Sequence, residues 1–247
     1  AMWSGPRNLS TALMRSFANR SDVTKVLDEP FYGAYLKRTN KDHPMKDVVI
    51  NSQCTDWDDV VDICKSKDEK GITYQKHMTQ HILYKDLSWT DSLCNCFLIR
   101  NPKDVVPSFL KAWPDGDYVD MGFSQQLELF NYVSHKSNKN PIVVDASQLR
   151  ISPEDSLKKL CMSINIDWDS QMLKWSSGIK EYDGVWAEHW YPSVKNSVSF
   201  KPITDTKEYN FTNKEKGIID KAMPAYEFLK SFINWNLFIG LFLNIFT

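Results

Sequence analysis

Short apolar runs alternate with segments of helical pattern, and this alternation constrains the fold more than any other feature of the chain. The apolar runs cover residues 1–4, 24–27, 72–76, 94–99 and 141–145. The helical segments cover residues 11–18, 31–37, 102–112, 153–162 and 212–232. This order is typical of βα units around a parallel sheet. We therefore predict one α/β domain over residues 1–247, with a central parallel sheet flanked by helices.

The charge of the chain is balanced, which bears on its partners. There are 30 Lys and Arg residues against 31 Asp and Glu residues, so the net charge is −1. Binding along a nucleic acid needs a surplus of basic residues, so we expect no nucleic-acid partner. A local basic pocket for one small anion is compatible with this balance.

The cysteines favour a reducing compartment. There are five, an odd number, and none forms a CxxC pair, so neither a disulfide framework nor a zinc ribbon is indicated. No signal peptide is visible, although the sequence opens almost within a motif. We expect a cytoplasmic location.

Residues 232–247 form an apolar segment that contains Asn234, Asn236 and Asn244. It is short for a membrane span and is interrupted by these amides, so we expect no span. A docked C-terminal helix is our interpretation, and an interfacial or dimer-forming helix is the alternative. The sequence leaves a homo-oligomer open.

The first anion-binding candidate is the turn at residues 3–11, between the first predicted strand and its helix. Such a turn directs unpaired N–H groups and the positive helix end at one point, where an oxyanion is stabilised. Arg7 adds guanidinium donors, and Ser10 and Thr11 add hydroxyl donors. The turn lacks the GK[ST] ending of a Walker A loop. The alternative is an ordinary βα turn with Ser as cap, and Ser10 or Thr11 is expected near the N-cap of the helix.

A second candidate follows the strand predicted at residues 94–99. Arg100 lies at the carboxyl end of this strand, where ligands of open α/β sheets bind. Pro102 suits the first turn of the following helix, and Ser108 lies about two turns further on. An anion that touches both side chains would lie along the helix flank. The alternative is a surface Arg and an ordinary helical Ser.

These two motifs resemble those of the sulfotransferases that use 3′-phosphoadenosine 5′-phosphosulfate (PAPS). The first resembles the family's loop for the 5′-phosphosulfate. The second resembles its loop for the 3′-phosphate, with Arg100 and Ser108 eight positions apart. Residues 28–31, Asp-Glu-Pro-Phe, match a segment of the compact bacterial-type branch. The resemblance implies a P-loop-like three-layer fold, PAPS as donor, 3′,5′-bisphosphoadenosine (PAP) as product and a small-molecule acceptor.

The chain also departs from the family pattern. Many members have Lys where this chain has Arg7, and Gly where it has Leu9, which restricts backbone approach relative to Gly. The late Arg-Lys-Gly segment of the family is not evident. Residues 190–197 are its candidate replacement, with Lys195 as the cation.

Sulfuryl transfer needs cations and N–H groups at the leaving phosphate and a general base for the acceptor. Arg7 and the N–H groups of Asn8, Leu9, Ser10 and Thr11 fit the first role, and we expect no metal. Glu29 is the predicted base, as the resemblance also implies.

His77 is the rival base, since the family often places a catalytic His near this point. The neighbouring Lys76 is either a contact of the bridging oxygen or an exposed side chain. We expect His81 to cap a helix or lie at the surface, and Asp28 to be a solvated neighbour of Glu29. An aromatic-rich segment at residues 166–206 is predicted to cover the site.

Two other functions stay open at this point. One is a P-loop-like nucleotide kinase or hydrolase, for which Asp145 is the candidate Mg²⁺ carboxylate. The other is a catalytically silent nucleotide-binding protein of the same fold, which Leu9 and the missing Arg-Lys-Gly segment keep open.

Overall fold

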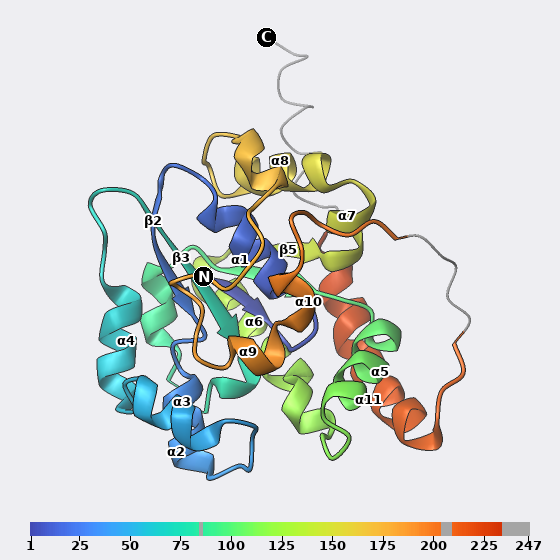
Figure 1. The fold of residues 1–247 in the computed structure, drawn as a ribbon. Coiled ribbons are helices and arrows are strands. Elements are labelled where there is room, and N and C mark those ends of the chain that lie inside the picture. The colour runs from blue at the N-terminus through green and yellow to red at the C-terminus, as the bar shows by residue number, and fades with distance from the viewer. Residues whose placement is uncertain (84–85, 204–208, 234–247) are drawn as a thin grey trace.

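The computed structural model describes residues 1–83, 86–203 and 209–233. Its sheet has five parallel strands in the order β2-β3-β1-β4-β5 (Figure 1). The strands are β1 (Met2–Ser4), β2 (Val23–Asp28), β3 (Ile72–Met78), β4 (Cys96–Ile99) and β5 (Ile142–Asp145). Each overlaps an apolar run of the sequence, so the predicted α/β sheet is confirmed.

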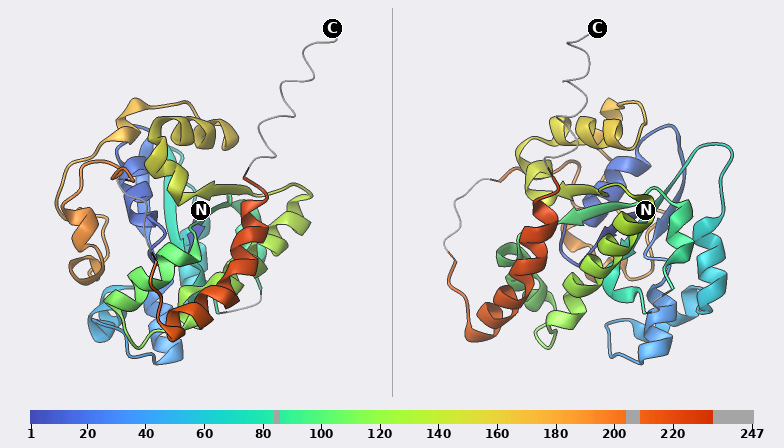
Figure 2. Two further views of the ribbon diagram at one scale, coloured as in Figure 1. Left: turned by 90° about the vertical axis from the view of Figure 1, so that its right-hand side faces the viewer. Right: turned by 180° about the vertical axis from the view of Figure 1, so that it is seen from behind.

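Helices cover both faces of this sheet (Figure 2). The α-helices are α1 (Ser10–Ala18), α2 (Tyr32–Thr39), α3 (Lys46–Ser52), α4 (Trp57–Lys65), α5 (Pro102–Ala112), α6 (Phe123–Ser137), α7 (Ala146–Ile151), α8 (Pro153–Ser163), α9 (Ala187–Trp190), α10 (Pro192–Lys195) and α11 (Asn213–Lys230). Short 3₁₀ helices lie at η1 (Thr79–His81), η2 (Ser88–Ser92), η3 (Tyr118–Met121) and η4 (Ser170–Leu173).

The alternation of side chains along the strands divides the core into two layers. Leu98 and Val144 face α1, α7 and α8. Phe97 and Val143, one residue earlier on the same strands, face α4, α6 and α11. Successive strand side chains point to opposite faces, so apolar runs without alternation predict a sheet covered on both sides. The result is the P-loop-like three-layer fold.

The predicted helices after β1, β2, β4 and β5, and the closing helix, are all present. Helices α3, α4, α6 and α7 lie in parts of the chain where no element is predicted. Helix α4 carries a readable start signal, because the Asp56 side chain accepts hydrogen bonds from the N–H groups of Asp58 and Asp59. The N-cap of α1 is Leu9, so Ser10 lies next to the N-cap as predicted, but no side chain caps the helix.

The carboxyl ends of four strands lie close together at one edge of the sheet. On β3, Lys76 is in register with Met2 of β1 and with Asp28 of β2. On the other side of β1, Trp3 is in register with Phe97 of β4. The loops that leave β1, β2, β3 and β4 therefore emerge beside one another.

Only Phe232 and Ile233 of the apolar C-terminal segment are described, and both pack beside α11 and α6. The predictions for residues 234–247 lie outside the described residues. Within the described ranges, no helix combines the length and the apolar character that a membrane crossing needs.

Candidate active site

A cavity of about 280 Å³ opens at this carboxyl edge. Its lining comes from the loops after β1, β2, β3 and β4, and from the segment that contains α9 and α10. Predicted site residues that line it are Arg7, Leu9, Ser10, Thr11, Glu29, Lys76, Arg100 and Ser108. Asn8, His77 and Lys195 are not among the lining residues.

The first loop presents the amino end of α1 to the cavity. A side chain at Gly5 would place its Cβ 2.3 Å from the carbonyl oxygen of Met121, so only glycine fits there. Arg7 and Leu9 have positive φ angles of 64° and 65°. No side chain caps α1 at Leu9, so the first N–H groups of this helix face the cavity without a capping side chain.

Asn8 holds this loop in place. Its side chain is buried and donates a hydrogen bond to the carbonyl of Leu98 on β4 (3.3 Å). The amide therefore ties the first loop to the strand that carries Arg100.

The two arginines lie together. The Nη1 of Arg100 donates to the carbonyl oxygen of Arg7 (2.7 Å), and the Nε of Arg7 donates to the Oγ of Ser108 (3.0 Å). Burial lowers the pKa of both guanidinium groups from the usual value, yet arginine keeps its charge at any physiological pH. The positively charged side chains of Arg7 and Arg100 thus lie together, where the loops after β1 and β4 meet.

Glu29 occupies a strained position directly after β2. Its φ angle is 47°, and its carboxylate is buried and paired with the Nζ of Lys76. Burial raises the pKa of Glu29, the charge of Lys76 opposes this, and the charge of Asp28 adds to it. Burial alone would lower the pKa of Lys76, but the two carboxylates outweigh it and raise that pKa.

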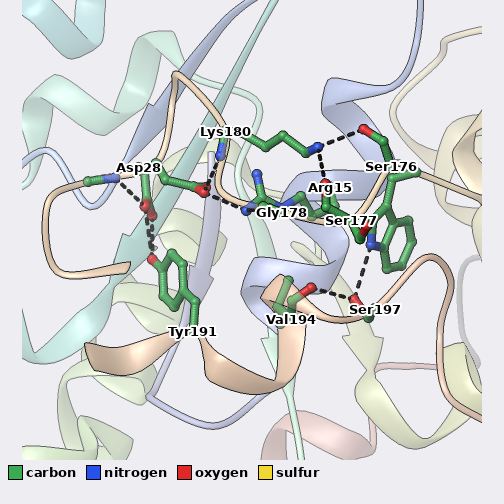
Figure 3. Close-up of polar contacts among 12 residues, drawn as sticks. Arg15, Asp28, Ser176, Ser177, Gly178, Lys180, Tyr191, Val194 and Ser197 are labelled. Atoms are coloured by element: carbon green, nitrogen blue, oxygen red, sulfur yellow. Dashed lines mark hydrogen bonds and ion pairs between the residues drawn. The ribbon is translucent and has the colours of Figure 1, made fainter. Parts of the chain in front are cut away.

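Asp28 is not solvated, contrary to the prediction. Its side chain is buried and accepts hydrogen bonds from Lys76 Nζ (2.9 Å) and the Gly184 N–H (3.1 Å). It also accepts one from Tyr191 Oη (2.9 Å) (Figure 3). Gly184 and Tyr191 come from the aromatic-rich segment, more than 150 residues away in sequence. Nothing in the sequence near Asp28 predicts that this distant segment covers it.

The structure does not bring His77 to the cavity. Because His77 follows Lys76 on β3, it points to the opposite face of the sheet. There its ring stacks on Trp3 (centroids 4.2 Å apart), and its Nε2 donates a hydrogen bond to the Oε1 of Gln75 (3.0 Å). His77 is a core residue, and burial lowers its pKa well below the usual value.

His81 lines the cavity in its place. It is buried, not exposed, and its Nδ1 lies 4.0 Å from an Oε of Glu29. Its ring stacks on Tyr32, with centroids 4.6 Å apart. The four-residue spacing from His77 does not form a helix face, since β3 ends at Met78 and η1 begins at Thr79. A prediction that extended the side-chain alternation of β3 past Met78 would place His81 on the same face as His77, away from the cavity.

The aromatic-rich segment forms one wall of the cavity, as predicted, through Trp190, Tyr191, Ser193 and Val194. It is fixed to α1 by an ion pair between Arg15 and Asp183 (2.5 Å) in which both side chains are fully buried. Lys195 contributes differently from the prediction. Its carbonyl oxygen accepts a hydrogen bond from the Gly178 N–H (2.7 Å), and its side chain is not part of the lining.

Asp145, the candidate magnesium ligand of the kinase alternative, is a helix cap. It accepts hydrogen bonds from the N–H and Oγ of Ser147 at the start of α7, both 2.7 Å long. It does not line the cavity. Across the described residues, no group of three or more His, Cys, Asp and Glu side chains is arranged to hold a metal ion.

Comparison with known sequences decides the family. Residues 1–233 match the family described as sulfotransferase domain. The chain belongs to the sulfotransferase family. The resemblance carried by the two loops is thereby confirmed, and the P-loop-like fold of this sulfotransferase domain agrees with it.

Two curated relatives are proteins of Arabidopsis thaliana. The domain is 35% identical to branched-chain-amino-acid aminotransferase-like protein 1 and 33% identical to branched-chain-amino-acid aminotransferase-like protein 2. The matches cover 94% and 92% of this chain but 41% and 40% of those proteins. The chain thus spans about two fifths of the length of the curated relatives it matches.

Two solved structures are also similar to this sulfotransferase domain. One is a sulfotransferase domain from the curacin biosynthetic pathway, with 13% identity, a TM-score of 0.47, and coverage of 90% of this chain and 96% of that one. The other is the sulfotransferase domain of the Synechococcus PCC 7002 olefin synthase, with 14% identity, a TM-score of 0.48, and coverage of 89% and 92%.

Proposed function

We propose that this domain transfers a sulfuryl group from PAPS to a hydroxyl or amine of a small-molecule acceptor. The proposal rests on one observation: Arg7, Arg100 and Glu29 all line the same cavity. A donor with phosphate groups at both ends of its ribose needs two cationic sites at a short separation. The acceptor needs a base beside them.

The donor side of the cavity is cationic and rich in N–H groups. In the proposal, Arg7 and the uncapped amino end of α1 bind the 5′-phosphosulfate, and Arg100 and Ser108 bind the 3′-phosphate. A hydroxyl that accepts a hydrogen bond keeps its own proton for donation, so Ser108 can serve Arg7 and an anion together. Arg7 and the N–H groups would stabilise the charge that grows on the leaving phosphate.

Glu29 accepts the proton of the acceptor in this scheme. As the O–H or N–H bond breaks, the acceptor atom bonds to sulfur, and the bond from sulfur to the bridging oxygen breaks with its electron pair on that oxygen. Lys76 lies against Glu29 and Asp28 and holds the carboxylate in place. The raised pKa of Glu29 makes it a stronger base than an exposed carboxylate.

Ligand-induced stabilisation tests the donor. PAP should raise the melting temperature of the protein in the absence of Mg²⁺, because it binds only the folded state. Turnover of labelled PAPS with added acceptors then separates an enzyme from a silent binding protein. Stabilisation by ATP with Mg²⁺ and none by PAP would refute the proposal and favour a kinase or hydrolase.

A further inference from the structure

A second group of polar side chains lines the cavity and has no role in donor binding. His43, Gln80 and His81 are each at least 91% buried, with exposed fractions of 9%, 8% and 2%. In each, one polar atom lacks a hydrogen-bond partner among the described residues: His43 Nε2, Gln80 Oε1 and His81 Nδ1. A buried polar atom without a partner is costly, which indicates a ligand that completes the hydrogen bonds.

These imidazoles are held neutral by their surroundings. Burial, reinforced by the charge of Lys41, lowers the pKa of His43 to about 4. Burial, reinforced by His43 and Lys76, lowers the pKa of His81 well below its usual value. A neutral imidazole has one donor and one acceptor nitrogen, and a hydroxyl group matches either.

The cations near this group are already paired. Lys41 forms an ion pair with Asp120, and Lys76 is shared between Glu29 and Asp28. An anionic acceptor buried beside His43, Gln80 and His81 would meet carboxylates whose cations are engaged, and a cationic acceptor would compete with Lys76 for the same two carboxylates, in each case at a high desolvation cost.

Aromatic rings supply the remaining walls. Tyr32 stacks on His81, and Trp113 packs edge-on against His43 with centroids 4.5 Å apart. Phe109 and Trp190 also line the cavity. Flat apolar walls of this kind bind a ring face, whether aromatic or the C–H face of a saturated ring.

We propose that the acceptor is an uncharged ring that carries two or more hydroxyl groups, one directed to Glu29 and another bound by Gln80 together with His43 or His81. This inference rests on the proposed sulfuryl transfer and names the substrate class of the same cavity. It predicts discrimination against both charged acceptors and acceptors with a single hydroxyl.

Binding of small probes to the PAP-saturated protein tests this class. In isothermal titration calorimetry, resorcinol should bind roughly tenfold more tightly than phenol, 3-hydroxybenzoate or 3-hydroxybenzylamine. Methyl β-glucoside and cyclohexanol form the matching pair for a saturated ring. In either pair, a tenfold higher affinity for the compound with several hydroxyl groups supports the proposal and identifies the ring type.

A matched pair of variants assigns the effect to the cavity. Gln80→Met should reduce the advantage of the diol over the single alcohol to within about threefold, because one buried hydrogen bond is lost. Tyr74→Phe also removes a buried unpartnered oxygen, but from the core outside the cavity, and should leave the advantage unchanged.

The proposal is refuted if a single alcohol or a charged analogue binds as tightly as the diol, if no probe binds, or if Gln80→Met keeps the full advantage. Failure of the donor proposal is recognised separately, as an absence of stabilisation by PAP. If PAP does not stabilise the protein, the same probe titrations carried out without PAP still test the acceptor class.

Discussion

Three residues of the cavity have backbone angles in the left-handed region: Arg7, Leu9 and Glu29. This region costs a residue with a side chain about 1 kcal/mol or more. For Glu29 the cost is offset by hydrogen bonds from its N–H to the carbonyl of Lys76 (2.9 Å) and from Gln53 to its own carbonyl (3.2 Å). Strain maintained by surrounding contacts is a common feature of functional sites.

Replacing the proposed base tests its role. Glu29→Gln should lower kcat by about 10²–10⁴-fold, since it removes the proton acceptor. The affinity for PAP, measured by calorimetry, should change less than about threefold, because Arg7 and Arg100 are untouched. Lys76 keeps Asp28 as its partner, so the fold should survive. A kcat close to that of the unmodified protein would exclude Glu29 as the base.

The charge of Asp28 should affect the pH dependence of kcat/KM. Burial first, and then the Asp28 charge, raise the pKa of Glu29. Only the deprotonated base is active, so the rate falls as pH drops below that pKa. In Asp28→Asn the repulsion is gone, the pKa of Glu29 falls, and the acid limb of kcat/KM should move to lower pH.

An exposed carboxylate provides the control for this variant. Asp47→Asn, on the surface of α3, should leave the acid limb where it is. An acid limb that stays in place in Asp28→Asn, or moves to higher pH, would contradict the coupling between Asp28 and Glu29.

Single residues of the site were predictable only where local sequence decides their position. Arg100 directly follows β4, and Arg7 lies in the short loop after β1, so the sheet edge brings both to the cavity. His77 and His81 depend on which face of β3 a side chain takes and on how the chain turns into η1. Asp28 depends on Tyr191, whose position no pattern near Asp28 indicates.

At the scale of elements, two of the contacts that join the segment over the cavity to the domain lie close to the proposed site. Gly184 and Tyr191 bind Asp28 beside the proposed base. Asp183 binds Arg15 on α1, whose amino end lies at the donor side. The same helix thus supports both the phosphate-binding loop and one wall of the cavity.

Breaking the Arg15–Asp183 pair should loosen this wall. Arg15→Met or Asp183→Leu alone leaves one buried charge unpaired and should lower the free energy of unfolding by about 3 kcal/mol. The double variant should be more stable than the sum of the two losses predicts. Urea unfolding measures all four proteins, and additive losses would contradict a direct buried pair.

The elements themselves were predictable to different degrees. The strands have apolar runs, and a helix that follows a strand can carry a start signal, such as Pro102 at α5. The helices α9 and α10 are each four residues long and lie among aromatic residues with little periodicity. Tyr191, between these two helices, binds Asp28 and Lys76, and these contacts are distant in sequence.

At the scale of the whole molecule, the strand order determines where the site lies. The chain passes from the central β1 to β2 on one side, and later crosses to β4 on the other side. In open α/β sheets, ligands bind at the carboxyl edge where the order reverses in this way. The loops after β1 and β4 therefore meet there, and bring Arg7 and Arg100 into one cavity.

The central claim is that these two loops bind the two phosphate ends of one nucleotide. Calorimetry of PAP and of AMP, which lacks the 3′-phosphate, with the unmodified protein and with Arg100→Ala tests it most directly. The account predicts that Arg100→Ala weakens PAP binding by at least about tenfold and AMP binding by less than about threefold. Equal losses for both nucleotides, or no binding of PAP to the unmodified protein, would contradict it.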